Sequence, residues 1–363
     1  MKRSVPKLVS TSVGWPKPER EGLLHAALGD YAEAIPAWED FLREEGADRL
    51  DDRALRLLPQ VYRNLVRHEY LGPAGGTTGP TMEFLREIAN EVQGRSEALL
   101  EEIRPVIRHL NQANIQTMLL QGRACDLLVP ANDLGRALDL LTRQGWRSEA
   151  GLPKGLTPTQ QRYRHAMELA SPTGLMLNLH WHVLHQSRGP RADEGFWKRA
   201  WPAGPGMDRC LRLSPTDQLL DICAQGFEDR IEDRIDTAND KTGHWVCEAM
   251  MTIRAVRIDW ELLLKLARQH DIMLPLGDAL RYLRESFHAP VPRSVIWRLR
   301  RARVSRVKYG RRVGRSPLER LIATYRDYRR GVRDWPWLRR LLGFPAYLAF
   351  SFRVAGPGRI TGN

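Results

Sequence analysis

The fold of this chain depends on two stretches, Met118-Leu-Leu-Gln-Gly-Arg-Ala-Cys-Asp-Leu-Leu-Val-Pro130 and Leu177-Asn-Leu-His-Trp-His-Val-Leu184. Both are apolar runs interrupted by polar residues, a pattern typical of strands that are buried on at least one face. We expect strands within 117–121, 124–129 and 175–183. Helical periodicity dominates the flanking sequence, so the sheet is small and the rest of the chain is largely helical.

Three short motifs in these stretches resemble a known family. They are Leu119-Leu-Gln-Gly122, Asp126-Leu-Leu-Val129 and Leu179-His-Trp181. They resemble the uncharacterised bacterial nucleotidyltransferase-like family of the polymerase-β-like superfamily. Its members read roughly L-L-K-G, a helix, R-x-x-D-x-D-L-L-V, and later a strand ending in carboxylate-x-H-W. The similarity covers roughly residues 20 to 300 and includes four further helical segments: 55–65, 211–217, 244–251 and 258–260.

The resemblance implies magnesium-dependent transfer of a nucleoside monophosphate from NTP to an acceptor. Enzymes of this superfamily hold two magnesium ions between carboxylates on adjacent strands, where the metals clamp the attacking and leaving oxygens at the α-phosphate. Two acids in a D-x-D spacing point the same way because strand side chains alternate with period two. The glycine ahead of them lets a triphosphate approach the backbone.

The chain departs from this template at several positions. Ala124 stands where the first acid of the pair is expected, and Asn178 stands where the third acid is expected. Gln121 replaces the usual lysine before the glycine. Gly122 leads almost directly into Arg123, so the helix that normally separates the glycine from the acids is missing. Gln121, Ala124 and Asn178 are therefore degenerate family positions.

Asp126 remains as the catalytic candidate, and as a metal ligand only if magnesium is bound. One carboxylate and a neutral amide cannot offset the charge of two divalent ions and a triphosphate, so two-metal chemistry would need acids from elsewhere. Glu149 and Glu168 are the nearest candidates, although the spacing of neither recommends it. We therefore expect impaired catalysis, with Gly122 and Arg123 as the nucleotide- or phosphate-binding residues.

The missing helix leaves two interpretations of the local fold. In the first, residues 117–121 and 124–129 form a tight hairpin about Gly122-Arg123. In the second, the first strand is lost from the sheet. An internal gene deletion or a sequence error is a further explanation, and the sequence does not choose among them.

His180 and Trp181 belong to the family motif, and we expect a hydrogen-bonded structural histidine beside a packed tryptophan. The alternative is a zinc site. His180 and His182 share one face of a strand over 175–183, and His185 follows, so two imidazoles could meet a metal ion. No cysteine pair or nearby acid completes a tetrahedral set.

Composition indicates a folded protein in a reducing setting. The chain has 363 residues, 42% of them hydrophobic, and this is ordinary for a globular protein with a sizeable core. The four cysteines form no C-x-x-C pair, and no signal peptide or apolar run of spanning length is visible. We expect a cytoplasmic protein, with peripheral attachment to the inner face of the membrane as an option.

The fold class that we expect is α+β and predominantly helical. A small reduced nucleotidyltransferase-like sheet is flanked by N- and C-terminal helical lobes and followed by a basic helical tail. The expected boundaries are 1–113 for the N-terminal helical lobe, 114–186 for the α/β core, 187–292 for the C-terminal helical lobe and 293–363 for the tail. Ser214 is expected to cap the helix that begins at Pro215.

Positive charge is concentrated in the tail. Residues 293–340 contain 17 Lys and Arg against 3 Asp and Glu, so they account for the net charge of +13 of the whole chain. Such a segment, through residues 293–352, could bind nucleic acid by charge and stacking or lie on an anionic membrane; a solvated basic helix is the third interpretation. The interleaved aromatic residues are Trp297, Tyr309, Tyr325, Tyr328, Trp335 and Trp337.

These observations leave three functional hypotheses. The first is a nucleotidyltransferase that uses NTP, with an acceptor that the sequence does not identify. The second is a non-catalytic relative that binds a nucleotide or a partner protein. The third is an adaptor that binds a membrane or nucleic acid through the basic tail. We expect a member of the family with impaired catalysis.

Overall fold

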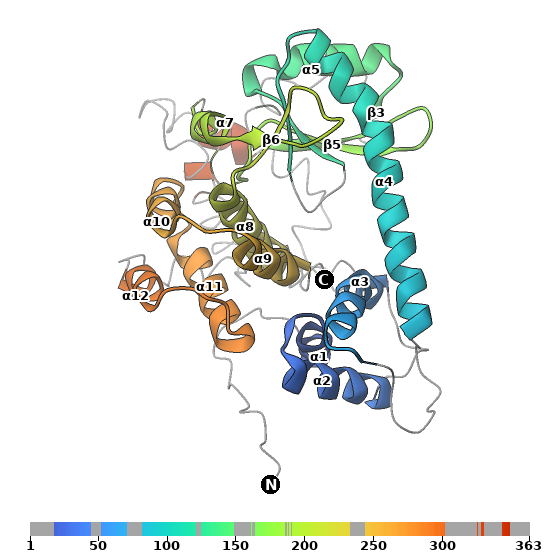
Figure 1. Cartoon of the computed structure of the whole chain (residues 1–363). Coiled ribbons are helices and arrows are strands. Elements are labelled where there is room, and N and C mark those ends of the chain that lie inside the picture. The colour runs from blue at the N-terminus through green and yellow to red at the C-terminus, as the bar shows by residue number, and fades with distance from the viewer. Residues whose placement is uncertain are drawn as a thin grey trace. The chain divides into compact units, whose positions relative to one another are not determined.

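The structure, a computed structural model, describes part of the chain, and the account below concerns these residues alone. They are residues 18–44, 52–70, 82–120, 125–148, 161, 164–185, 187, 189, 191–232, 244–301, 325, 328–329 and 343–348. Most of them lie in helices, and a seven-stranded mixed sheet is built from short strands. The expected α+β, predominantly helical class is confirmed (Figure 1).

The helices before the sheet are α1 (Pro18–Leu28), α2 (Tyr31–Glu44), α3 (Asp52–Arg67) and α4 (Met82–Gln112). Those within and after the sheet are η2 (Ala131–Asp133), α5 (Leu134–Arg143), α7 (Glu194–Arg199), α8 (Pro215–Glu232), α9 (His244–Ala255), α10 (Trp260–Gln269), α11 (Met273–Phe287) and α12 (Arg293–Arg301). None of the helices among the described residues combines the length and apolarity needed to cross a bilayer.

The strands are β1 (Thr117–Leu119), β2 (Asp126–Leu128), β3 (Arg147–Ser148), β4 (Ala166–Ala170), β5 (Met176–His180), β6 (Trp201–Pro202) and β7 (Cys210–Arg212). Their order in the sheet is β3-β4-β5-β2-β1-β7-β6. The pairs β2·β5 and β1·β7 are parallel, and the other neighbours are antiparallel.

The two strands on either side of Gly122-Arg123 in the sequence are antiparallel neighbours. Met118 of β1 lies opposite Leu128 of β2, and the amide of Leu120 donates to the carbonyl of Asp126 at 3.0 Å. The hairpin interpretation is therefore correct, and the first strand is kept in the sheet. The turn itself, residues 121–124, lies outside the described residues.

The strand expected over 175–183 is shorter than predicted. β5 ends at His180, and the next residues leave the ladder: the amides of Trp181 and His182 both donate to the carbonyl of His165, at 2.9 and 3.3 Å. The prediction that His182 shares a strand face with His180 is therefore wrong. The apolar pattern of the sequence continues to Val183 although the strand does not, because Trp181 and Val183 are also buried in the irregular segment after β5.

One face of the sheet packs on two helices. Leu127 of β2 and Leu179 of β5 lie side by side in the register, and both are fully buried. They join one hydrophobic cluster with apolar residues of α4 and α5, including Ile107 and Leu138. Apolar residues recur every three to four positions along α4 and α5, so each helix presents an apolar stripe to this face of the sheet. The sheet is therefore packed against α4 and α5 on this face.

The described residues group into two compact units. The first takes its residues from 1–92, 225–251 and 279–290, and the second from 93–224, 252–278 and 291–363. The sheet and its hydrophobic cluster belong entirely to the second unit. The four-part division predicted from the sequence stays a prediction.

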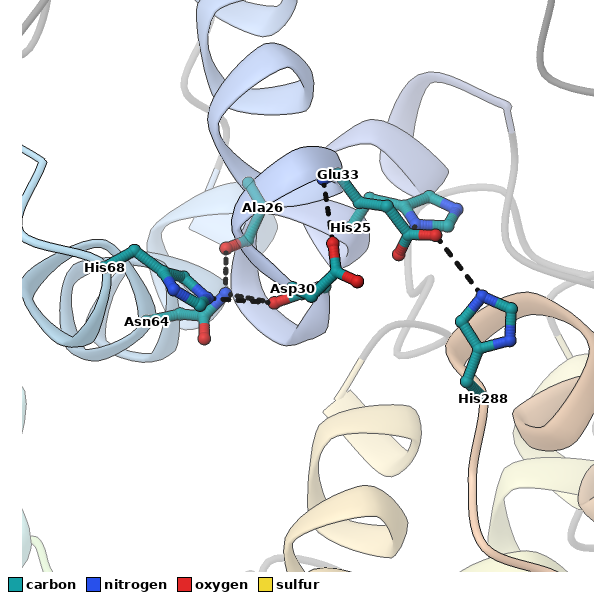
Figure 2. Close-up of polar contacts among 8 residues, drawn as sticks. His25, Ala26, Asp30, Glu33, Asn64, His68 and His288 are labelled. Carbon is teal, nitrogen blue, oxygen red and sulfur yellow. Dashed lines mark hydrogen bonds and ion pairs between the residues drawn. The ribbon is translucent and has the colours of Figure 1, made fainter. Parts of the chain in front are cut away.

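Polar caps join the helices of the first unit (Figure 2). The last carbonyl groups of a helix have no intrahelical partner, and at the end of α1 the side-chain amide of Asn64 donates to the carbonyls of Ala26 and Gly29, both at 3.0 Å. Asp30 caps α2 by accepting from the amide of Glu33 at 3.2 Å. A Cβ at Gly29 would lie 2.6 Å from the carbonyl oxygen of His25, so this tight junction requires glycine.

Candidate functional site

A row of polar side chains crosses the sheet on the face opposite α4 and α5. Asn178 of β5 is the Cα partner of Asp126 on β2 and of Glu168 on β4. Paired residues of neighbouring strands project to the same side. The three side chains therefore share one face, while Leu127 and Leu179 project to the packed face.

The register places Asn178 directly beside Asp126. In the family that the motifs resemble, this is the relation expected between an acid of the D-x-D pair and the third acid. Asn178 therefore stands where the resemblance predicts a third acid, and β5 supplies no carboxylate beside Asp126. Glu168 lies one strand further, so that its Cα is about 10 Å from that of Asp126, two interstrand spacings away.

Burial increases along this row. Glu168 is exposed and Asn178 is half-buried. Asp126 is only 5% exposed and His180 only 2% exposed. A buried carboxylate is costly unless it is paired or hydrogen-bonded, and His180 is an ion partner of Asp126, since its Nε2 lies 3.2 Å from Oδ2 of that carboxylate.

The contact between Asp126 and His180 is close but poorly aligned. Neither ring nitrogen of His180 forms a hydrogen bond of normal geometry with any residue that the structure describes. The ring centroid of His165 lies 5.6 Å from that of His180, and His165 also packs edge-on against His185 at 4.9 Å. A cluster of three imidazoles therefore adjoins the single acid of β2.

The thiol of Cys125 lies close to the negative charges of the site. Its carbonyl accepts from the amide of Asn178 at 2.9 Å, which extends the pairing of β2 with β5 by one residue. The pKa of the Cys125 thiol is raised, first by burial and then by the negative charges of Asp126 and Glu102. The other three cysteines are buried. The reactivity of Cys125 therefore reports on the negative charges that lie beside it.

The histidine that the sequence grouped with His180 has a different partner. Nδ1 of His182 lies 2.6 Å from Oδ2 of Asp193, and the other oxygen of Asp193 accepts from the amide of Val183 at 2.9 Å. Asp193 is 8% exposed, so this is a buried pair that holds the segment after β5 against the start of α7. In the zinc hypothesis, His182 was expected to act beside His180, and that geometry is not formed.

The donor set does not fit two magnesium ions. Magnesium prefers carboxylate, phosphate and water oxygens in octahedral geometry. Asp126 is the only acid of β2, Asn178 is neutral, and histidine nitrogens are poor ligands for this ion. Among the residues that the structure describes, no group of three or more His, Cys, Asp or Glu side chains is arranged to hold a metal ion.

Several of the predicted site residues lie outside the described part of the chain. They are Gln121, Gly122, Arg123, Ala124 and, among the candidate substitute acids, Glu149. Of the predicted site residues, Asp126, Asn178 and His180 are brought together, with Glu168 at the exposed end of the row.

Trp181 lies under the site in the hydrophobic cluster of the sheet. It is 1% exposed, and its indole N–H donates to the carbonyl of Gln161 at 3.0 Å. A buried tryptophan with a satisfied N–H packs well and fixes the chain direction after β5. Trp181 is thus buried, as expected for the packed tryptophan of the motif.

The start of α8 is held by a buried ionic network. Ser214 accepts from the amide of Asp217 at 3.4 Å and donates its hydroxyl to Oδ2 of Asp217 at 2.7 Å, so the predicted cap is confirmed. Arg199 of α7 forms a forked pair with the fully buried Asp217, with contacts of 2.7 to 3.2 Å. Planar guanidinium suits this arrangement. The network ties α7 to the helix that follows β7.

Sequence reasoning missed His165, Asp193 and Arg199. His165 precedes β4 and is far from His180 in sequence, and only the antiparallel pairing of β4 with β5 brings the rings together. Asp193 stands before a short helix, as many capping residues do, and no local pattern connects it with His182. A pairing of strands is a long-range event that a local pattern does not encode.

The profile of a family described as uncharacterised nucleotidyltransferase matches residues 123–288. The match begins immediately after Gly122 and includes Asp126, Asn178 and the Leu179-His-Trp181 motif. No match was found among the curated proteins or among the solved structures. For residues 123–288, the resemblance to a nucleotidyltransferase-like family that these motifs indicated is confirmed.

Proposed function

We propose that this chain is a nucleotidyltransferase-family protein in which transfer of a nucleoside monophosphate from NTP is impaired, and that the retained fold binds a nucleotide or a partner protein. The observation that carries this proposal is the row across β2, β5 and β4. Asp126 lies beside the neutral Asn178 and the imidazole of His180, and the second acid of the row, Glu168, is two strands away.

Charge and burial both support impaired catalysis. Metal ions in two-metal sites lie about 3.5 to 4 Å apart and bridge shared carboxylates. Asp126 and Glu168 are separated by about twice an interstrand spacing, so they do not form such a clamp without rearrangement. Asp126 is also nearly inaccessible, so a hydrated ion would have to displace its covering residues.

The first experiment measures catalysis directly. Purified full-length chain is incubated at high concentration with each NTP and with magnesium or manganese, and pyrophosphate release is followed. We expect the native chain to release no more pyrophosphate than the Asp126→Ala variant. Magnesium-dependent release that is lost in Asp126→Ala would overturn the proposal. If Glu168→Gln also loses that activity, Glu168 is the substitute acid.

A second experiment separates nucleotide binding from protein partnership. Thermal unfolding of the native chain is measured with and without each NTP, in the presence and absence of magnesium. Stabilisation by a nucleotide supports the nucleotide-binding form of the proposal, because a ligand that binds only the folded state raises the unfolding temperature. No response to any nucleotide leaves partner binding as the retained role.

The basic tail supports a second candidate function, attachment to an anionic membrane surface or nucleic acid. On α12 the side chain of Trp297 is 55% exposed, and the guanidinium of Arg301 lies 4.4 Å from its ring centroid. An exposed aromatic ring beside arginines suits both partners. Tyr328, by contrast, is 1% exposed and packs on Phe344 and Tyr347, so its ring is not available for stacking.

The tail hypothesis is tested by truncation after Arg301. Val295 and Leu299 of α12 are buried, so a cut before α12 would remove packed residues together with the tail. The shortened chain and the Trp297→Ala variant are compared with the native chain for binding to anionic vesicles and to single-stranded nucleic acid. Equal binding by all three proteins, or no binding by the native chain, would exclude this function.

A further inference from the structure

A small pocket lies between α4 and the turn that connects β6 with β7. Its volume is about 180 Å³. The side chains and backbone that line it include Arg104, Arg108, Asn111, Gly206, Asp208 and Arg209. Pockets that take drug-sized ligands have volumes of roughly 300 to 1,000 Å³. This pocket therefore suits a single small group, such as a phosphate, rather than an entire nucleotide.

Two of the three arginines lack a side-chain partner among the residues that the structure describes. Arg108 and Arg209 form no ion pair or hydrogen bond with another residue in the described ranges. Arg104 pairs with Glu101, yet its Nε is buried without a hydrogen-bond partner among those residues. An unsatisfied buried N–H is costly. Each guanidinium can accommodate two oxygens of a phosphate in its fork.

The negative groups at the pocket are fewer. The carboxylate of Glu101 is engaged by Arg104, and Asp208 lines the pocket with its own charge. Three guanidinium groups against two carboxylates leave a local excess of positive charge. A monoanionic phosphate would balance that excess, and a dianionic phosphate would leave a single negative charge.

The turn that faces α4 is built to a defined shape. Gly206 has φ +74° and Arg209 has φ +60°, both in the left-handed region that favours glycine. A side chain at position 206 would come within 3.4 Å of the guanidinium of Arg104. The turn is held by Asn111, whose amide donates to the carbonyl of Asp208 at 3.0 Å and whose oxygen accepts from Thr117 at 3.2 Å.

The pocket is separate from the row that contains Asp126. Thr117 pairs with Cys210, the residue after Arg209, so the pocket adjoins the first residue of β1. Asp126 faces the other end of that strand, where its carbonyl accepts from the amide of Leu120. The pocket also lies on the α4 side of the sheet, whereas Asp126 projects to the opposite face.

We propose that this pocket binds a phosphate group, either the free anion or an ester, through Arg104, Arg108 and Arg209. The site does not depend on the proposed function, because none of its residues belongs to the row of Asp126, Asn178 and Glu168. Arg209 is held in a strained backbone conformation at the pocket. Such a conformation persists only where the surrounding structure fixes it, as the turn does here.

The test is calorimetric titration of the full-length chain with inorganic phosphate, pyrophosphate and AMP at constant ionic strength. We expect saturable binding, weakened roughly tenfold or more by Arg108→Gln and by Arg209→Gly, since a charge-assisted hydrogen bond is lost in each. Glycine at position 209 also accepts the positive φ, so this variant is not expected to unfold. Binding of AMP as well as phosphate would identify a phosphate ester as the ligand, whereas exclusion of AMP would identify the free anion.

Three further variants complete the design. Asp208→Asn removes the counter-charge at the pocket, so it should tighten phosphate binding several-fold. Arg143→Gln, an exposed arginine on α5 that does not line the pocket, and Asp126→Ala should leave the affinity unchanged. Absence of saturable binding, equal affinity in the native chain and in Arg108→Gln and Arg209→Gly, or loss of binding in Asp126→Ala would overturn the proposal.

Discussion

The two faces of the sheet differ in what holds them. On the packed face, Leu127 and Leu179 lie fully buried against α4 and α5. On the opposite face, the same strands carry Asp126 and Asn178, side by side at the next register position. One face is stabilised by removal of apolar surface from water, whereas the other places a buried charge beside a neutral amide. The comparison teaches that burial of apolar side chains on one face is enough to hold the strands together, whatever charges the other face carries.

The largest expected effect concerns the packed face. Leu179→Ala should lower the free energy of unfolding by about 2 to 5 kcal/mol, because it removes buried methyl groups and leaves a cavity between β5 and the helices. Urea denaturation followed by circular dichroism provides the measurement. A loss below about 1 kcal/mol would mean that this face is not the main stabilising side of the sheet.

On the polar face, a variant that adds a second acid tests the effect of charge. Asn178→Asp places a second carboxylate beside Asp126, so without metal it should destabilise the chain by about 1 to 3 kcal/mol. Magnesium or manganese should recover that loss in the variant and leave the native chain unchanged, as measured by thermal unfolding. Combination with Ala124→Asp, which restores the remaining family acid, should strengthen the response to metal. Equal responses of native chain and variants would contradict the view that missing charge is what impairs the site.

Cys125 provides a smaller and more local effect. Because burial and the charge of Asp126 raise the pKa of its thiol, the thiolate fraction at a given pH is reduced. Asp126→Asn removes that charge, lowers the thiol pKa and should accelerate alkylation by iodoacetamide near pH 8 on the order of a few-fold. Mass spectrometry of the modified peptide follows the rate. An unchanged rate would mean that Asp126 is uncharged or screened from Cys125.

The smallest effect is expected at the exposed end of the polar row. Glu168→Gln should change the free energy of unfolding by no more than about 0.5 kcal/mol, because its side chain is solvent-exposed and substitutions there are usually near neutral. The same urea titration used for Leu179→Ala measures it, and the two variants form a matched pair on adjoining strands. A large loss would show that Glu168 takes part in an interaction across the polar face.

Local patterns were sufficient for much of the fold. The apolar periodicity predicted an N-terminal helical lobe, in which α4 lies, and Ser214 with Pro215 predicted the start of α8. Both features depend on residues within one or two helical turns of each other. The end of β5 was placed too late because buried residues continue beyond the strand, and burial alone does not require ladder hydrogen bonds.

The candidate site was predictable only in part. The motif identified Asp126 and His180, and the degenerate position Asn178 followed from the family spacing. Glu168 was named as a candidate acid, but its place in the row follows from the pairing of β4 with β5. His165 was missed, because only that pairing brings its ring beside His180. The partner of His182 was also missed, since Asp193 approaches it from the start of α7.

By itself, the amino-acid sequence determined the family motifs, the absence of two of their acids and the helical character of most of the chain, because each of these is a property of residue type and short-range spacing. The tertiary structure alone decided that β1 stays in the sheet as a hairpin partner of β2, that Asn178 lies beside Asp126, and that Arg209 faces α4. The physical reason is that strand register and helix packing bring together residues far apart in the chain, and many sequences with the same local pattern could pair differently.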